Sequence, residues 1–352
     1  MLGTLLFNGA SLIYAIIGSL RGRKIFLIAA LACTFVFLSI RSDFGNDLAR
    51  YEAIFEEIAA TEWRGIYDVN PGFEKGYVFW NKLFSIAGFN AFLATAAWLS
   101  ILGYYRLISV GVVPSLRFFS VFLLLFNPGI ILIQSSAVRQ SIAVAFFVLS
   151  SGFLVERKPF RFVAMILVGS TFHVSVLVML PLYFVLRPAP IARKTGFFHI
   201  GLYVVAVLAG SSMIRAVMGS GFAFLERYNV YAGMDSTAGQ VVTHLVRIAF
   251  LLFLGQYGRG ATGLGSVAIR AVMIGYVIFA FGSNLTMIVR LSFYLEPFAI
   301  VAFPVAVRNI KSRRLAHIVI TLVMMYYLRV FFNFFADPTW REAFSTYRTI
   351  FS

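Results

Sequence analysis

The chain has little of the charge that a soluble protein of its size carries. Only 12% of its 352 residues are charged and 60% are apolar, and the mean hydropathy is +0.87. A soluble fold of this length would need far more charge on its surface. The composition therefore excludes a soluble globular protein and is typical of polytopic membrane proteins.

Cysteine and metal-binding patterns are also scarce. The only cysteine, Cys33, lies in an apolar run, which excludes a disulfide framework and a thiolate metal site. The four histidines have no spaced acidic partner, and no Asp-x-Asp pair is present to hold a metal-bound nucleotide sugar. The glycine-rich stretch 258–265 follows no predicted strand and lacks the Lys-Ser/Thr pair of a phosphate-binding loop. We therefore expect neither a metal nor a cofactor.

The net charge of +16 has the size expected of a nucleic-acid-binding protein, but most of the excess lies in short loops between apolar runs. The positive-inside rule accounts for such loops, so we expect no nucleic-acid partner. The first apolar run lacks a basic start and a cleavage site, which argues against a cleavable signal peptide. No linker or repeat divides the sequence, which predicts a single membrane domain over residues 1–352.

The apolar runs predict an all-α, polytopic integral membrane protein with about 10–12 transmembrane helices, each of about 20 residues or slightly fewer. A further apolar stretch, 162–186, is interrupted by polar residues around His173. It is either one span or a pair of half-helices that forms a re-entrant hairpin. The predicted spans lie near 4–20, 24–40, 89–108, 118–133, 142–155, 197–217, 241–257, 268–283, 285–307 and 315–332.

Basic loops predict the orientation. Seventeen of the thirty basic residues lie in six loops, which we place on the cytoplasmic side. Segment 41–76, with eight of the fourteen acids, then faces outward, as do a second loop at 218–240 and the tail 333–352. The apolar spacing from Leu48 to Ile58 predicts an amphipathic helix along the membrane surface. The six loops contain Arg21/Arg23/Lys24, Arg106/Arg117, Arg157/Lys158/Arg161, Arg187/Arg193/Lys194, Arg259/Arg270 and Arg308/Lys311/Arg313/Arg314.

Four arginines lie inside or beside apolar runs, towards the predicted outer side: Arg139, Arg247, Arg290 and Arg329. A guanidinium keeps its charge, so each needs a carboxylate, water, a headgroup or an anionic ligand. This pattern predicts an anion site in the outer half of the membrane. Arg329 lies near a helix end, where snorkelling to water is the better explanation. For Arg247, an ion pair with Glu296 is an equal alternative.

Short motifs recur among the outward-facing positions. In order, they are Arg41-x-x-x-Gly45-x-Asp47-x-x-x-Tyr51, Glu74-x-Gly76-Tyr77, Arg139-Gln140, Phe172-His173-x-Ser175, Arg290-x-x-x-Tyr294, and Tyr347 in the tail. Over nearly the whole chain, this order and spacing resembles the EpsG-like branch of the Wzy polysaccharide polymerases. The tail departs from the family's pattern, because Ser-Thr-Tyr-Arg stands where the family has Pro-Tyr.

The resemblance implies an enzyme of the bacterial cytoplasmic (inner) membrane that polymerises O-antigen, capsule or exopolysaccharide. Its partners would be undecaprenyl-pyrophosphate-linked oligosaccharides, membrane lipid and a chain-length regulator protein. Paired guanidinium contacts suit a pyrophosphate leaving group. The motifs and the intramembrane arginines together give the residues predicted to bind pyrophosphate or glycan: Arg41, Arg139, Gln140, Arg247, Arg290, Tyr51, Tyr77 and Tyr294.

Three residues are candidates for the group that takes the acceptor proton: Asp47, His173 and Glu74. Asp47 ranks slightly ahead, because a base is needed on the acceptor's side rather than among the arginines. Asp47 and Glu74 would alternatively cap a surface helix, and His173 would alternatively be a hydrogen-bonded core histidine. The competing functions are a ligase that uses the same lipid donor, and a flippase, for which internal repeats would be expected.

Overall fold

The computed structural model describes residues 1–218, 238–283 and 286–351. The chain is an all-α polytopic membrane protein, as predicted, and one pair of two-residue strands is the exception within these ranges. The outer loop expected at 218–240 lies almost entirely outside the described residues. The elements are α1 Leu2–Arg21, α2 Lys24–Ser39, β1 Arg41–Ser42, α3 Leu48–Ala60, α4 Ile66–Val69, α5 Lys75–Phe84, α6 Phe89–Gly111, η1 Pro114–Leu116, α7 Arg117–Phe126, α8 Leu132–Ser136, α9 Val138–Val155, α10 Pro159–Ser170, η2 Val174–Met179, α11 Leu182–Val185, α12 Thr195–Met218, α14 Ala238–Tyr257, α15 Gly263–Gly282, α16 Thr286–Ser292, η4 Glu296–Phe298, α17 Ala299–Arg308, α18 Arg313–Ala336, α19 Pro338–Phe344 and β2 Arg348–Thr349.

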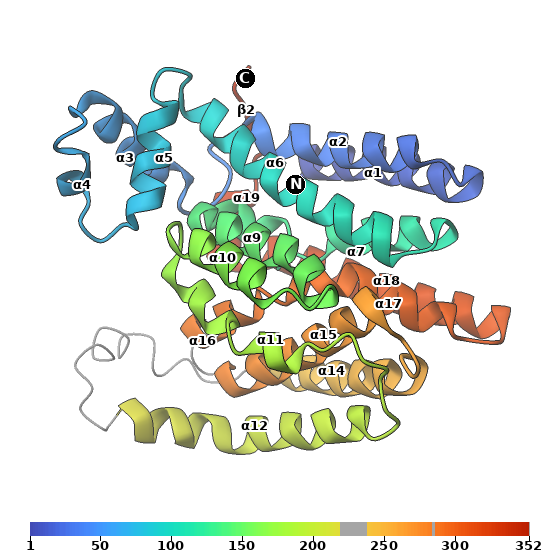
Figure 1. Ribbon diagram of the computed structural model, residues 1–352. Coiled ribbons are helices and arrows are strands. Elements are labelled where there is room, and N and C mark those ends of the chain that lie inside the picture. Colours follow the sequence, from blue (N-terminus) through green and yellow to red (C-terminus); the bar gives the residue numbers. More distant parts are fainter. Residues whose placement is uncertain (219–237, 284–285, 352) are drawn as a thin grey trace.

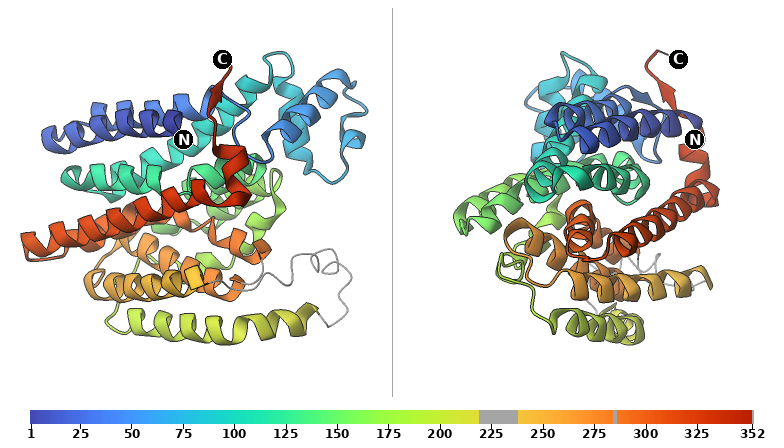
Figure 2. Two further views of the ribbon diagram at one scale, coloured as in Figure 1. Left: turned by 180° about the vertical axis from the view of Figure 1, so that it is seen from behind. Right: turned by 90° about the vertical axis from the view of Figure 1, so that its right-hand side faces the viewer.

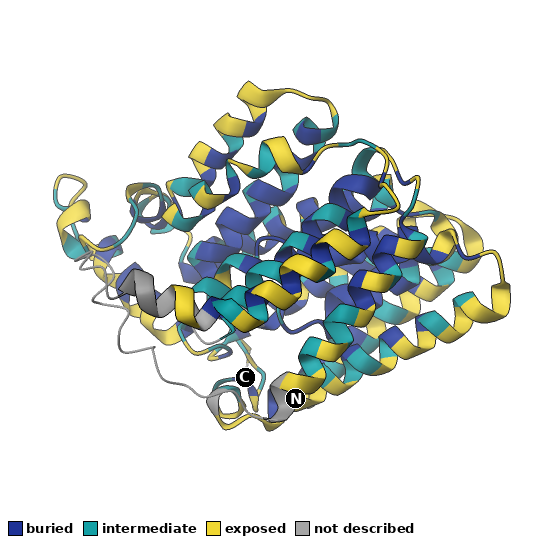
Figure 3. Ribbon diagram, turned by 90° about the horizontal axis from the view of Figure 1, so that it is seen from below, coloured by how far each residue is buried: buried dark blue, intermediate teal, exposed yellow. Residues whose placement is uncertain are grey.

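Within the described ranges, six helical segments are long and apolar enough to cross a membrane. Central and peripheral segments differ in burial. The segments Val138–Val155 and Ile288–Arg308 are each 67% buried, against 28% for Leu2–Arg21 and 22% for Arg313–Ala336. Buried residues thus gather in the middle of the bundle (Figure 3). The outer helices α1 and α18 leave apolar side chains exposed, as helices that face lipid do.

The two ends of the bundle differ in charge. In Figure 1, α3, α4 and α5 lie at the left end, whereas the α1–α2, α6–α7 and α17–α18 connections lie at the right. Hydrogen bonds join further basic loops at that right end: Gly260 N–H donates to the Ile191 carbonyl, and Gly263 N–H to that of Pro188. We call the end with α3–α5 the acidic end and the opposite end the basic end. Which side of the membrane each end faces stays a prediction.

Proline breaks two of the predicted spans. The run expected at 118–133 ends as a helix at Phe126, because Pro128 has no N–H and restricts the residue before it. The run expected at 285–307 divides into α16, η4 and α17, since Pro297 cannot donate to the carbonyl four residues earlier. Arg290 lies in α16, the part of this run that precedes the break.

The stretch 162–186 forms two short arms. Helix α10 ends at Ser170, a turn follows, and η2 and α11 lead back along it (Figure 1). His173 is the N-cap of η2, with an extended backbone at φ −156° and ψ 110°. Of the two alternatives for this stretch, the structure has the pair of half-helices. Whether they re-enter the membrane stays a prediction.

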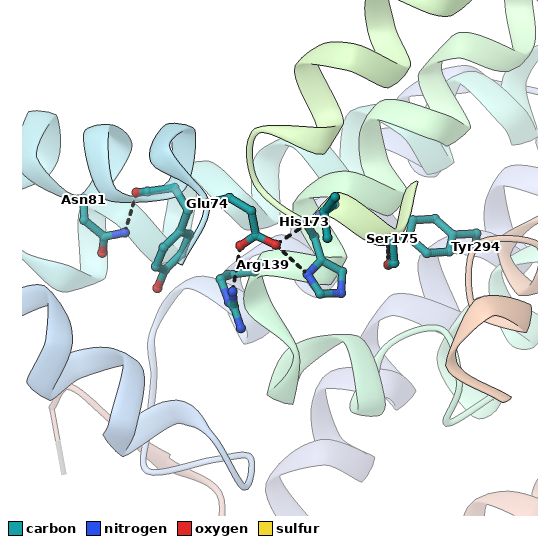
Figure 4. A network of polar contacts seen from close by, with 8 residues as sticks. Glu74, Asn81, Arg139, His173, Ser175 and Tyr294 are labelled. Atoms are coloured by element: carbon teal, nitrogen blue, oxygen red, sulfur yellow. Dashed lines mark hydrogen bonds and ion pairs between the residues drawn. The ribbon is translucent and has the colours of Figure 1, made fainter. Parts of the chain in front are cut away.

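The acidic segment folds against the bundle. Helix α3 buries the apolar positions expected of it, from Leu48 to Ile58. These side chains pack on α5 and α6, so protein rather than the membrane surface covers this face. Beyond α3, the chain passes through α4 to α5, whose first turn lies beside the hairpin turn (Figure 4).

The tail docks on the acidic end (Figure 2). Strand β2 pairs antiparallel with β1, aligning Thr349 with Arg41. Gly45 N–H donates to the Ala343 carbonyl at 3.0 Å, and its φ of 121° suits glycine. Tyr347 stacks on Phe37 with ring centroids 4.6 Å apart and donates to the Phe37 carbonyl at 2.6 Å. In this structure Tyr347 therefore anchors the tail.

Candidate functional site

Glu74 is the centre of a charged cluster at the acidic end. One carboxylate oxygen accepts from Arg139 at 2.7 Å, and the other lies 3.2 Å from His173 Nδ1. The second oxygen also accepts from the Val174 N–H at 3.0 Å. Figure 4 shows the three side chains converging from α5, α9 and the hairpin turn. We call Glu74, Arg139 and His173 the carboxylate cluster.

The cluster keeps Glu74 ionised. Burial alone would raise the pKa of this carboxyl, but the His173 hydrogen bond, the Arg139 charge and the Val174 N–H outweigh it and lower the pKa to about 2. Both oxygens are engaged, and so acidic a carboxyl is a weak base near neutral pH. Glu74 stands at the N-cap of α5, yet its side chain makes no capping hydrogen bond. The contacts of Glu74 therefore favour a role in orienting Arg139 and His173 over a role as a helix cap or as a proton acceptor.

Gly76 explains how the hairpin comes close enough to Glu74. The Tyr77 N–H donates to the Thr171 carbonyl at 3.1 Å, which joins α5 to the hairpin turn. A Cβ at Gly76 would lie 2.5 Å from the Thr171 Cβ and 2.7 Å from its carbonyl oxygen. Real side chains do not tolerate such distances, so only glycine permits this approach.

Replacing Gly76 with alanine should therefore separate His173 from Glu74. We expect Gly76→Ala to lose at least about tenfold in activity, the usual size of losing an oriented hydrogen bond to a charged group. The measurement is the activity of each variant, normalised to the amount of inserted protein. Gly72→Ala is the matched control, because a Cβ there meets only Asn70 Oδ1, at an ordinary 3.5 Å. Equal activity of the two variants would contradict this role for Gly76.

Arg139 is held by aromatic rings as well as by Glu74. Its guanidinium lies 4.0 Å from the ring centroid of Phe73 and 5.9 Å from that of Tyr77. It also interacts with the Tyr51 hydroxyl. The predicted residues Tyr51, Tyr77 and Arg139 are thus brought together with Glu74. The carboxylate balances the charge of Arg139, which leaves less of it for a substrate.

A cavity of about 120 Å³, lined by both polar and apolar side chains, lies beside this cluster. It is formed by the start of α3, the α8–α9 junction, α16 and α19. Asp47, Gln140 and Arg290, all predicted from the sequence, contribute to its wall. We call it the Arg290 cavity. Its lining residues are Asn46, Asp47, Ser136, Ala137, Gln140, Val289, Arg290, Phe293 and Trp340.

Arg290 is exposed and makes no ion pair or side-chain hydrogen bond within the described residues. Its backbone is fixed instead, because Gln140 Nε2 donates to the Arg290 carbonyl at 2.8 Å. Asp47 shares the cavity and is the N-cap of α3, but its carboxylate makes no capping hydrogen bond. The cavity therefore presents one cation and one carboxylate to whatever enters it.

Two tyrosines connect these groups. The Tyr294 hydroxyl lies 2.8 Å from Ser175 Oγ, which ties the bend after α16 to the hairpin (Figure 4). Tyr51 interacts electrostatically with Asp47 and Arg290 as well as with Arg139. The cavity and the carboxylate cluster are thus neighbouring parts of one site.

Three arginines lie elsewhere. Arg41 is buried; it donates to the Leu38 carbonyl and, at 3.2 Å, to that of Ser135. Burial lowers the pKa of Arg41 to about 10, so it stays charged at neutral pH. Arg247 lies 4.0 Å from Glu296 and stacks on Phe279 at 3.2 Å, so the structure contains the ion pair. Arg329 is exposed on α18.

Several residues of the site are not singled out by the sequence. Trp340 closes the Arg290 cavity from the tail, and Asn46 and Ser136 complete its wall. Phe73 could have been predicted from the sequence, since it directly precedes Glu74. Trp340 could not, because the residues that it contacts in the cavity wall are remote in sequence.

Taken together, the fold and the site define a polytopic membrane protein with a charged site for polar ligands at one end of its bundle. A family model for the EpsG family matches residues 24–349, nearly the whole chain. The chain belongs to the EpsG family, and the resemblance in its motifs is confirmed. That family is associated with polysaccharide polymerases of the Wzy type. No curated protein and no solved structure matches the chain.

Proposed function

We propose that the protein joins undecaprenyl-pyrophosphate-linked oligosaccharide repeat units by glycosyl transfer at the outer face of the cytoplasmic membrane. The observation that supports this most is the Arg290 cavity, where a cation without an ion-pair partner among the described residues and a carboxylate face the same space. A glycosyl transfer from a pyrophosphate needs both groups, one for the leaving group and one for the proton.

In the proposed step, a hydroxyl oxygen of the acceptor sugar attacks the anomeric carbon of the donor glycan. The bond between that carbon and the pyrophosphate oxygen breaks, and undecaprenyl pyrophosphate leaves with the electron pair. Asp47 takes the hydroxyl proton, and the Arg290 guanidinium forms paired hydrogen bonds with phosphate oxygens as their charge grows.

The cavity size limits what enters it. At about 120 Å³ it is smaller than the roughly 300–1,000 Å³ of typical small-molecule sites. It therefore holds the reacting groups rather than a whole repeat unit. In this proposal the remaining sugars extend away from the acidic end, and the prenyl chain lies along the outer helices in lipid.

His173 is the alternative base. Glu74 holds its Nδ1, which fixes the ring and favours the tautomer with its proton on that nitrogen. The Nε2 atom would then be free to accept a proton, and Glu74 would act as a positioning residue. Asp47 stays ahead because it shares the cavity with Arg290.

A deletion mutant tests the proposed function against a lipid-linked glycan ligase. Loss of a polymerase should leave single repeat units attached to the final acceptor, resolved as one short band by gel electrophoresis. A ligase mutant should leave none attached, and a flippase mutant should leave the lipid-linked units facing the cytoplasm. Absence of attached single units would reject the polymerase.

The orientation follows from the same proposal and has its own test. Single cysteines replacing Glu57 and Thr349 at the acidic end, in a chain lacking Cys33, should react with an impermeant thiol reagent in intact cells. A cysteine replacing Ser312, at the basic end, should react only after permeabilisation. The reverse pattern would place the site in the cytoplasm and remove the lipid-linked substrate from its reach.

A further inference from the structure

A second polar cavity lies at the basic end, on the opposite side of the bundle from the carboxylate cluster. Its volume is about 550 Å³, within the range of about 300–1,000 Å³ typical of small-molecule sites. The last turns of α6, α9 and α17 and the first turn of α15 enclose it. The proposed glycosyl transfer makes no use of this space.

The cavity is lined by two cations without tight partners. Arg106 and Arg308 both contribute to its wall, and neither makes a side-chain hydrogen bond or ion pair within the described ranges. Arg106 lies in electrostatic range of Glu156, which also lines the cavity. Lys158, 2.7 Å from Glu156, already balances that carboxylate. The cavity therefore carries an excess of positive charge.

The backbone adds further hydrogen-bond donors. Helix α15, 20 residues long, starts in the cavity wall, and its N-cap Thr262 makes no side-chain capping bond. The positive end of the helix dipole is thus directed into the space. Glycines at 111, 152, 260 and 265 keep the wall open, and a Cβ at Gly152 would clash with the Arg106 guanidinium.

We propose that this cavity binds a phosphate ester of a polyol, of the glycerol phosphate type. The two guanidinium groups and the start of α15 would hold the phosphate. Glu156 repels a second anionic group but accepts hydrogen bonds from hydroxyls, and Ser151, buried in the same wall, offers a further hydroxyl. A phospholipid headgroup and a soluble ester share this chemistry.

Two probes distinguish the sources. Soluble glycerol 3-phosphate is titrated calorimetrically into the full-length protein in detergent. Phosphatidylglycerol is detected by native mass spectrometry of protein taken from nanodiscs of phosphatidylcholine with and without it. We expect saturable binding of at least one probe. Binding of the lipid alone would identify a headgroup site, and binding of the soluble ester alone a metabolite site. Binding of neither would overturn the proposal.

Charge-matched variants locate the binding. Arg106→Gln with Arg308→Gln should weaken it at least about tenfold, as expected for the loss of charge-assisted hydrogen bonds. Arg193→Gln with Lys194→Gln removes the same charge from exposed positions at the basic end outside the cavity. Equal weakening in both pairs would show a diffuse basic surface and reject the site. Arg308→Gln alone, at an exposed side chain, guards against misfolding of the pair and should still weaken binding measurably.

Discussion

Replacing Arg290 with alanine should abolish polymer while the protein is still made and inserted. The guanidinium has no ion-pair partner among the described residues, and it lines the cavity that it shares with Asp47. Losing two charge-assisted hydrogen bonds to a pyrophosphate leaving group corresponds to a rate reduction of about 100-fold or more. The chain-length distribution of polymer on gels, normalised to inserted protein, measures the effect.

Arg290→Lys separates charge from geometry. Lysine keeps the charge but lacks the planar fork, so we expect activity between that of wild type and the alanine variant. Arg329→Ala is the control, because Arg329 is exposed on α18 and lies outside the site. Arg139→Ala should also be inactive, but for a different reason: Glu74 would lose its partner at 2.7 Å. Normal polymer from Arg290→Ala would eliminate the pyrophosphate site proposed here.

Asp47→Asn should bind lipid-linked repeats but fail to join them. Asparagine keeps the shape and hydrogen bonding of the side chain and removes its ability to accept the proton. Loss of a general base typically costs about 10²–10⁴ in rate. Binding of the lipid-linked repeat and formation of the new linkage are measured separately on purified protein, so that a binding defect is not mistaken for a chemical one.

His173→Gln and Glu74→Gln decide between the two bases. If His173→Gln is inactive while Asp47→Asn polymerises normally, His173 is the base and Glu74 its positioning partner. In that case Glu74→Gln should also lower the rate of linkage formation, since the His173 ring loses the carboxylate that orients its Nδ1. If all three variants stay active, general-base catalysis by these residues is wrong.

Much of the scaffold was predictable because it depends on local patterns. Apolar runs located the helices, and the spacing from Leu48 to Ile58 located the buried face of α3. The prolines were visible too, but the sequence alone did not show that Pro297 would divide a span of ordinary length. The sequence could not show what covers the apolar face of α3, because a helix that packs on protein and a helix that lies on a membrane have the same amphipathic pattern.

The site was predictable as a set of residues but not as an arrangement. Glu74 is 65 residues from Arg139 and 99 from His173, and no periodicity links positions so far apart. For Arg247, an ion pair with Glu296 and an anion site were equal alternatives in the sequence, and only the structure shows that this pair forms while Arg290 faces a cavity. Arg41 begins the acidic segment, yet backbone carbonyls take up its hydrogen bonds. Such distinctions depend on tertiary contacts.

The docking of the tail has a consequence for the order of biosynthesis. Trp340 completes the wall of the Arg290 cavity, whose other residues come from 46–47, 136–140 and 289–293. The hydrogen bond from the Gly45 N–H to the Ala343 carbonyl likewise needs the tail. During translation the described membrane helices therefore emerge before the Arg290 cavity is complete. A ribosome stalled after α18 would leave an inserted but incompetent bundle. Under the proposed function, polymer therefore forms only after the segment with Trp340 has been translated and has docked on the bundle.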